Sequence, residues 1–231
     1  MALRLRKDDS VLVRTPVMPP DRNSSDAKLD VLLDPDGDAQ FTARALIKGG
    51  NAAFLRQELE AQNSRRERFA NSLATQYPGA RLGDLRIQSL KDISEPLRYN
   101  YTAFIPTFAK RTGDTLEIPL DHGAFLVARY GRLPERRYDL IVGAPMEASR
   151  KVVLSSPAAF EISEVPSNTR IETKFGSLKL DVIVDGGQII IQRFMEIKSH
   201  RVAAGDYADF VNFCRQVDEA MSARIVLRRP Q

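Results

Sequence analysis

Three aspartates, Asp34, Asp36 and Asp38, have the i, i+2, i+4 spacing of the first ligands in a calcium-binding loop. Such a loop also needs glycine at its sixth position and glutamate at its twelfth. Here Gly37 is fourth and Ala45 is twelfth. An Asp-Gly pair between two β-prone runs is instead typical of a hairpin turn, because glycine readily adopts positive φ. We therefore predict a turn and no metal-binding residue.

Cys214 is the only cysteine, so an internal disulfide is excluded and the redox compartment stays undecided. A nucleophilic thiol needs a base and a group that orients the base. The two histidines, His122 and His200, precede Cys214 in turn-like contexts. Cys214 itself falls on the apolar stripe of a predicted helix, where a small hydrophobic residue is expected. A buried structural cysteine and two solvated histidines are predicted, and no spacing indicates a zinc site.

Other catalytic motifs are absent from the sequence. No G-x-S-x-G occurs, and Gly49-Gly50 is not followed by the Lys-Ser/Thr of a phosphate-binding loop. No catalytic, cofactor-binding or metal-binding residue is predicted, and no cofactor is expected. A hydrolase that uses an unrecognised carboxylate pair stays open as a minor alternative.

The composition is that of an ordinary globular protein, with 43% hydrophobic and 28% charged residues in 231. The formal charge of +4 is small, and the basic residues are scattered rather than clustered, so nucleic acid is not an expected partner. No apolar run is long enough for a membrane span. The N-terminal residues lack the apolar core of a signal peptide.

The elements that must position any site are organised around residues 176–227. Alternating residues predict a strand over 177–184, the turn Asp185-Gly186-Gly187 follows, and a second strand covers 188–198. The second strand begins apolar on both faces, so we expect this hairpin near the middle of a sheet. An amphipathic helix over 204–221 and a short closing strand complete the chain.

The first part of the chain predicts an α+β unit. Strands 28–33 and 39–47 flank the Asp-Gly turn, one helix runs from an Asn51 cap to Pro78-Gly79, and strand 82–90 follows. Gln62 and Arg66 interrupt the apolar stripe of that helix, which indicates a loosely packed middle. Short strands dominate from residue 97 onward. They are expected at 97–105, 115–119, 137–142, 149–154, 160–165 and 169–174, besides the hairpin.

These elements predict a mainly β fold with an α+β N-terminal part: an antiparallel β-sandwich closed by a C-terminal helix. The expected divisions are an extension or linker over 1–27, with a strand at 11–13, then an α+β unit over 28–92 and a sandwich with its helix over 93–231.

Several short sequence segments, taken in chain order, resemble segments of one protein family. Leu12-Val13-Arg14-Thr15-Pro16, Leu32–Ala39 and Tyr77-Pro78-Gly79-Ala80 resemble the region that follows the catalytic domain in bacterial transglutaminase-like proteins. Phe175-Gly176-Ser177, Arg201-Val202 and Tyr207-Ala208-Asp209-Phe210 are similar to that region's closing segment. The resemblance spans residues 11–227, and its motifs are turns, caps and core positions.

The resemblance implies a β-rich domain of unknown function without catalytic residues. The family's core carries a Cys–His–Asp triad in that chain order, and no histidine follows Cys214. The chain would then be a non-catalytic accessory region that positions a protein or peptide substrate, or a partner, for the catalytic domain of its parent. That parent would be exported to the periplasm or cell envelope. The alternative is a stand-alone β-sandwich module that binds protein or glycan.

Overall fold

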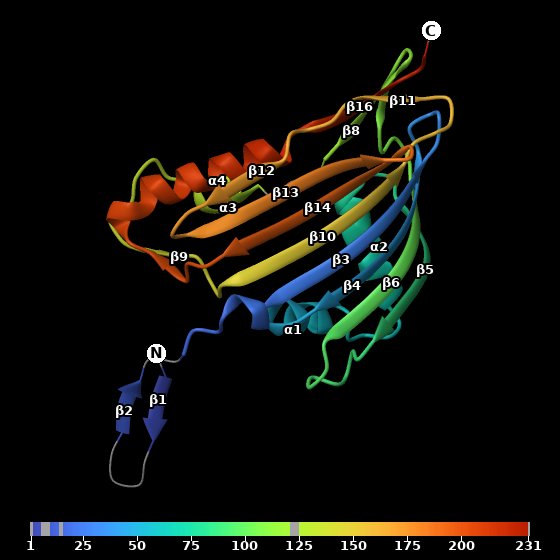
Figure 1. The fold of residues 1–231 in the computed structure, drawn as a ribbon. Coiled ribbons are helices and arrows are strands. Elements are labelled where there is room, and N and C mark those ends of the chain that lie inside the picture. The colour runs from blue at the N-terminus through green and yellow to red at the C-terminus, as the bar shows by residue number, and fades with distance from the viewer. Residues whose placement is uncertain (1, 6–9, 14–15, 121–124, 231) are drawn as a thin grey trace.

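The computed structural model describes residues 2–5, 10–13, 16–120 and 125–230, and an eight-stranded sheet dominates it (Figure 1). The chain is mainly β, with 44% strand and 23% helix. The strand order is β12-β13-β14-β10-β3-β4-β6-β5. Its strands are β3 (Ser24–Leu33), β4 (Ala39–Ile47), β5 (Arg81–Gln88), β6 (Leu97–Ile105), β10 (Met146–Ser155), β12 (Thr169–Glu172), β13 (Gly176–Asp185) and β14 (Gln188–Ile197).

Smaller sheets and helices complete the fold. A four-stranded sheet has the order β11-β16-β8-β7, and β1 pairs with β2 and β15 with β9. These strands are β1 (Ala2–Leu5), β2 (Ser10–Val13), β7 (Lys110–Thr112), β8 (Thr115–Pro119), β9 (Leu140–Ile141), β11 (Glu161–Glu164), β15 (Arg201–Val202) and β16 (Arg224–Arg228). The helices are α1 (Gly49–Glu58), α2 (Arg65–Gln76), α3 (Leu126–Tyr130) and α4 (Tyr207–Met221), with 3-10 turns at Pro20–Arg22 and Ala204–Asp206.

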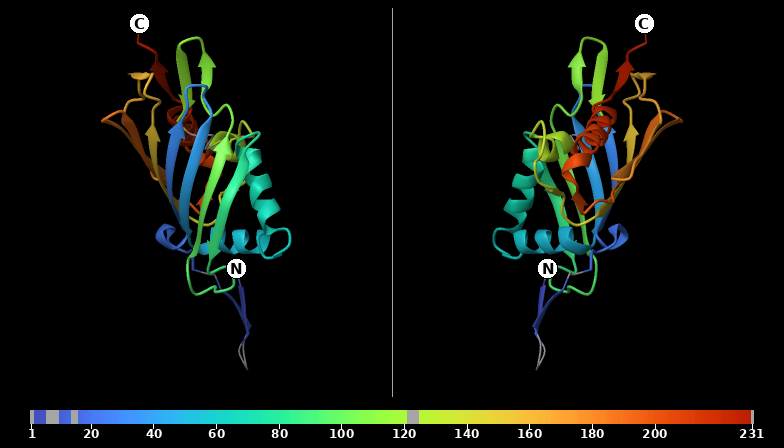
Figure 2. Two further views of the ribbon diagram at one scale, coloured as in Figure 1. Left: turned by 90° about the vertical axis from the view of Figure 1, so that its right-hand side faces the viewer. Right: turned by 90° about the vertical axis from the view of Figure 1, so that its left-hand side faces the viewer.

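The two faces of the large sheet differ in burial. On β14, Ile189, Ile191 and Ile197 are buried, whereas the alternate residues Gln192 and Phe194 are exposed. We call the face with the buried residues the covered face and the other the open face. In the side views α2, in teal, stands as a separate layer to one side of the strands (Figure 2), and it lies behind them in Figure 1. Because side chains alternate along a strand, this division extends across the sheet through the strand register.

Two apolar clusters cover the sheet. The first joins α2 and the four-stranded sheet to the strands, through Leu73, Leu116 and Ile225 among others. The second joins α4 and α3 to β13 and β14, through Phe210, Leu178 and Met195. The core therefore lies on one side of one sheet, under helices along most of its width and under a second sheet at one end (Figure 1).

Much of the predicted local structure is confirmed. Strands 39–47, 97–105 and 115–119 match β4, β6 and β8 to the residue, and the β3–β4 and β13–β14 hairpins form. The predicted strand at 11–13 falls in β2. The mainly β composition, the mostly antiparallel pairing and the C-terminal helix also agree. The finer prediction of a closed sandwich is not confirmed.

Three details of the sheet were predicted incorrectly. The hairpin is not buried on both faces, since Ile183 is 45% exposed on the open face. Strand β10 pairs parallel with β3, so the sheet is not purely antiparallel. The expected linker to residue 27 is shorter, because Ser24–Ala27 already belong to β3 and pair with β10. The last two depend on the pairing of β3 with β10, a partner distant in sequence, so local patterns carry no signal for them.

The single predicted helix from Asn51 to Tyr77 is two helices. Helix α1 ends at Glu58, and α2 begins at Arg65. Gln62 and Arg66, the polar interruptions of the stripe, are both exposed. The turn between the helices brings the Arg65 guanidinium to the Leu59 carbonyl, with Nε donating at 2.7 Å. A helix continued through the polar positions would have directed them toward the core, and the break keeps them in solvent.

Other elements differ in extent. The strand expected over 137–142 is reduced to β9, and α3, β7 and β15 were not predicted. The sheet takes β3, β4 and β5 from before residue 92 and the other five strands from after it. The division of the chain at residue 92 stays a prediction.

Candidate functional site: the open face of the sheet

The aspartates singled out by their spacing form a hairpin turn. Asp34 Oδ1 accepts the backbone N–H groups of Asp36 and Asp38, each at 2.9 Å. Asp38 Oδ1 accepts the N–H of Thr107 at 2.8 Å. Asp36 pairs with Arg111 at 2.6 Å. Each carboxylate thus has its own partner, and the three stabilise the turn rather than converge on one point.

Cys214 lies in the α4 cluster and is fully buried. Burial first, and then the Asp218 carboxylate, raise the pKa of its thiol to about 12. A thiol with a raised pKa is a poor nucleophile near neutral pH, because the thiolate is the reactive form. Asp218 itself accepts the N–H groups of Leu126 and Val127, at 2.8 and 2.9 Å, and so anchors α3 to α4.

The histidines do not assemble into a site with Cys214 in the described part of the chain. His200 is exposed, and its Nδ1 lies 2.8 Å from the Gly143 carbonyl oxygen. The prediction for His122 lies outside the described residues. Within the ranges that the structure describes, no group of three or more His, Cys, Asp or Glu side chains could hold a metal ion.

The open face carries a row of cations that crosses three neighbouring strands. Lys151 on β10 lies directly opposite Lys28 on β3, and Lys28 lies directly opposite Arg44 on β4. Arg86 on β5 lies in the same row, two strands beyond Arg44, and is opposite Asn100 on β6. Among the described residues, no ion pair involves Lys28, Arg44 or Lys151. We call Lys28, Arg44 and Lys151 the cation row.

Such a row is unfavourable for the sheet itself. Like charges directly opposite each other on adjacent strands destabilise the pairing. Asp26 and Asp30, two residues to either side of Lys28 on the same face, offset part of the repulsion. An anionic group bound over the row would offset the rest.

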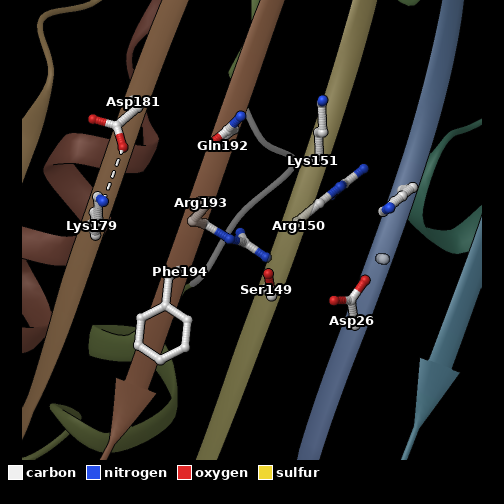
Figure 3. Close-up of a pocket in the computed structure, with 11 residues that line it drawn as sticks. Asp26, Ser149, Arg150, Lys151, Lys179, Asp181, Gln192, Arg193 and Phe194 are labelled. Carbon is white, nitrogen blue, oxygen red and sulfur yellow. Dashed lines mark ion pairs between the residues drawn. The ribbon is translucent and has the colours of Figure 1, made fainter.

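A groove of about 310 Å3 lies beside the row, between β13, β14, β10 and β3 (Figure 3). Its floor is low because the small Ser149 lies in register between Phe194 on β14 and Asp26 on β3. Lys28 and Lys151 line one side of the groove, and Lys179 and Asp181 line the other.

The far wall of the groove is held by ion pairs. Asp181 accepts from the Arg170 guanidinium and lies 3.7 Å from Lys179 Nζ, the pair drawn as a dashed line (Figure 3). The hydrogen bond from Arg170 holds the pKa of Asp181 below its ordinary value. Its charge is therefore already balanced, and Lys28, Lys151 and Asp26 carry the charges at the opposite wall.

Apolar side chains flank the cation row on the same face. Ile183 on β13, Ile190 on β14 and Val153 on β10 are direct cross-strand neighbours and form a short stripe. Ile183 is exposed, and the other two are partly buried. Because the face carries charge and apolar surface side by side, it suits a partner that offers both.

Sequence reasoning did not find these residues. Lys28 and Lys151 are 123 positions apart, and their adjacency depends on the parallel pairing of β3 with β10. The only local signal is that Lys28, Arg44 and Lys151 each occupy an outward position of an alternating strand.

The comparisons with known proteins concern the second half of the chain. No helix in the described ranges is long and apolar enough to cross a membrane. No curated protein matches the sequence. Residues 124–227 match the family model described as Domain of Unknown Function with solved-structure structure (DUF3858). The match includes α4 and Lys151 but neither β3 nor β4. A DUF3858 domain is thus found within this chain, over residues 124–227.

Proposed function

We propose that this chain is a non-catalytic binding region that holds an acidic segment of a protein partner or substrate on the open face of its sheet. The cation row supports this proposal most directly. Three like charges in register on an uncovered face oppose folding, and an acidic segment above them would relieve the repulsion.

The proposal that the chain is non-catalytic rests on the environment of Cys214, the candidate nucleophile. Cys214 is buried under α4 with a raised pKa, which keeps its thiol protonated near neutral pH. The groove on the open face holds lysines, aspartates, a serine and a phenylalanine, but no described histidine or cysteine lines it. Such a surface binds and orients; it does not supply a nucleophile with its base.

An acidic polypeptide fits the face better than nucleic acid does. A nucleic-acid surface is strongly basic over a continuous patch. Here Asp26 and Asp30 flank Lys28, and the apolar stripe adjoins the row. A segment with acidic and apolar side chains would meet the row and the stripe together.

The proposed neighbour is the catalytic domain of a transglutaminase-like parent, as the sequence resemblance implies. In this proposal the parent is an exported bacterial protein, and the open face positions its protein substrate. The stand-alone binding module is the alternative, and the same face would serve it. Reading the gene upstream of Met1 separates the two: a Cys–His–Asp domain in frame supports the accessory role, and a stop codon supports the module.

The binding surface is testable with a defined acidic probe. Fluorescein-labelled poly-L-glutamate is titrated against the purified chain at low salt, and anisotropy is recorded. In the triple variant Lys28→Glu, Arg44→Glu, Lys151→Glu, we expect affinity to fall by about tenfold or more, because three attractive contacts become repulsive. Added salt should weaken binding to the unaltered chain, since exposed charges are screened.

The matched control reverses the same amount of charge elsewhere. Lys48, Lys91 and Lys110 are exposed and lie outside the strands of the large sheet. Their triple change to Glu should alter affinity by no more than about twofold. Equal losses in the two triple variants would mean that only net charge matters, and the proposed surface would be wrong. Tighter binding of a single-stranded DNA oligomer than of poly-glutamate would instead indicate a nucleic-acid partner.

A further inference from the structure

A cavity of about 330 Å3 lies between α1, α2 and β6, on the covered face of the sheet. Figure 2 shows the two helices meeting at a corner beside the strands. The volume is near the lower end of the roughly 300–1,000 Å3 that small-molecule sites occupy. A ligand of the size of a single amino acid therefore fits it. We call this the corner cavity.

The inner wall of the corner cavity is aromatic and aliphatic. Phe69 on α2 lies edge-on against Tyr99 and Tyr101 on β6, with ring centroids 5.4 and 5.3 Å apart. Leu59 and Leu73 are buried and also line the wall. Aromatic rings favour edge-to-face contacts because of their charge distribution, and a further ring adds to such a cluster in the same way. The wall therefore suits a planar ring.

Two tyrosine hydroxyls line the cavity without a hydrogen-bond partner in the part of the chain that the structure describes, those of Tyr99 and Tyr101. Burial is the largest influence on the pKa of both and raises it, so both hydroxyls stay protonated near neutral pH. A hydroxyl that is shielded from water and lacks a partner costs free energy. A ring with a polar edge, such as indole or phenol, would supply that partner.

The outer rim of the cavity carries one charge of each sign. Glu58 at the end of α1 and Arg68 on α2 are both exposed, and the exposed side chains of Ser72 and Gln76 complete the rim. Arg68 Nη1 donates to the backbone carbonyl oxygen of Glu58 at 3.3 Å, which places the guanidinium beside α1. Within the described ranges, neither side chain forms an ion pair. Both charges are therefore available to a ligand at the mouth of the cavity.

We propose that the corner cavity binds a free aromatic α-amino acid, such as tryptophan or tyrosine. The ring lies against the aromatic wall, with its polar edge at a tyrosine hydroxyl. The ammonium group lies at Glu58, and the carboxylate lies at Arg68, whose planar guanidinium matches carboxylate geometry. The two charges of the rim complement the two charges of one zwitterion. A ligand with only an acid or only an amine would leave one rim charge unmatched and would meet a like charge.

This site lies on the opposite face from the cation row and does not depend on the proposed function. The cation row attracts net negative charge over a wide surface, whereas the corner cavity takes a ligand without net charge. Added salt should therefore weaken poly-glutamate binding much more than amino-acid binding. Failure of either proposal leaves the other standing.

The test titrates a fixed, dilute concentration of L-tryptophan with the full chain. The chain contains no tryptophan, so excitation selective for indole reports the ligand alone. We expect a saturable blue shift and a rise in anisotropy, with Kd on the order of 0.1–1 mM for a ligand of so few atoms. Indole-3-propionate and tryptamine, which each lack one charge, should bind about threefold to tenfold more weakly. N-acetyl-L-tryptophanamide, which represents a tryptophan within a polypeptide, should also bind more weakly.

Two charge variants test the head group through selectivity. Glu58→Gln should weaken tryptophan binding by about threefold to tenfold and should not weaken binding of indole-3-propionate, which has no ammonium group. Arg68→Gln should weaken tryptophan binding by the same factor but not tryptamine binding. A variant that only loosened the fold would weaken all ligands alike. The matched control is Glu67→Gln, on α2 but outside the cavity lining, with every ligand expected within about twofold.

A variant that fills the cavity tests the position of the ring. Ser72 is an exposed residue of the rim, so a larger side chain there removes no core contact. Ser72→Phe should weaken tryptophan binding by about tenfold or more, because the new ring occupies the cavity. Asn71→Phe, at the preceding residue and outside the lining, should leave binding within about twofold. Circular dichroism checks that each variant is folded.

Three results would overturn the proposal. The first is the absence of a saturable change in tryptophan emission. The second is equal affinity for L-tryptophan, indole-3-propionate and N-acetyl-L-tryptophanamide, which would show that the head group is not recognised. The third is an equal effect of Ser72→Phe and Asn71→Phe in folded variants, which would place the ligand elsewhere. If Ser72→Phe does not fold, the selectivity changes in Glu58→Gln and Arg68→Gln decide the question.

Discussion

The two halves of the covered face are packed very differently, although helices cover both. Under α4, the stripe of Tyr207, Phe210, Phe213, Cys214, Val217 and Met221 is almost completely buried. Under α1 and α2, cavities remain between helix and sheet. Helix α1 buries only Ala52, and Phe54 is 65% exposed.

The continuity of the apolar stripe explains this contrast. On α4 the apolar residues recur at i, i+3, i+4 and i+7 without a gap, so the helix packs closely against the strands below it. The corresponding stripe of the first helical segment is broken at Gln62 and Arg66, where the chain turns. One half is thus organised for stability, whereas the other retains internal space that a ligand could occupy.

Among the changes considered, truncation after Ala203 should have the largest effect on the packing of the covered face. It removes α4 and also β16, which lies between β11 and β8 in the four-stranded sheet. Both apolar clusters would lose part of their cover, so we expect insoluble protein or a molten state without a cooperative thermal transition. Near-UV circular dichroism and a thermal melt measure this. A cooperative melt at an unchanged temperature would show that α4 is an appendage.

A single substitution at the centre of the α4 cluster should have the next largest effect. Phe210 is fully buried and contacts the rings of Tyr130 and Phe175, with centroid separations of 5.7 and 5.4 Å. Phe210→Ala should lower the free energy of unfolding by about 3–5 kcal/mol. Phe210→Leu, which retains most of the volume, should cost clearly less. Equal losses, measured by urea denaturation, would argue against a tightly packed cluster.

The β3–β4 turn shows that the α1/α2 half is tightly packed at one end, unlike the region of its cavities. Gly37 has φ +94°, and a Cβ there would lie 2.4 Å from the Ala109 carbonyl oxygen. Gly37→Val should therefore destabilise by about 2–3 kcal/mol, from positive φ together with backbone contact. Gly113→Val is the control, since its φ is also positive but no atom lies within 4 Å of its Cβ. The control should be less destabilising in denaturant titration.

The thiol of Cys214 should make the α4 half sensitive to high pH. Its pKa is raised to about 12, against 9.0 for an unperturbed thiol. The unfolded thiol loses its proton first, so the stability contributed by the neutral thiol is complete below pH 9 and is lost as pH rises toward 12. Between pH 9 and 10 we expect a loss on the order of 1 kcal/mol that Cys214→Ala lacks. Parallel slopes of stability against pH in the two proteins would contradict this.

Phe54 on α1 should give the smallest effect. Because its ring is mostly exposed, Phe54→Ala should change the free energy of unfolding by less than about 0.5 kcal/mol. The amide hydrogens of α1 should also exchange faster than those of α4, since fewer buried contacts oppose local opening. A loss as large as that of Phe210→Ala would mean that the two halves are packed alike.

Local patterns in the sequence were sufficient to predict the elements in which buried and exposed positions recur with a regular period. Strands β4, β6 and β8 were predicted to the residue, and the α4 stripe predicted a buried Cys214. The broken stripe at Gln62 and Arg66 indicated loose packing but not the break itself, because helix propensity alone does not register the cost of turning two polar side chains inward.

The cation row, in contrast, exists only through strand pairing. Lys28 meets Lys151 across a pairing between segments that are 123 residues apart. A shift of one residue in that pairing would move the side chains to the other face. The amino-acid sequence determines which residues can face outward from each strand, whereas the register of distant strands determines which of them become neighbours. Register depends on the packing of the whole covered face, and no local segment contains that information.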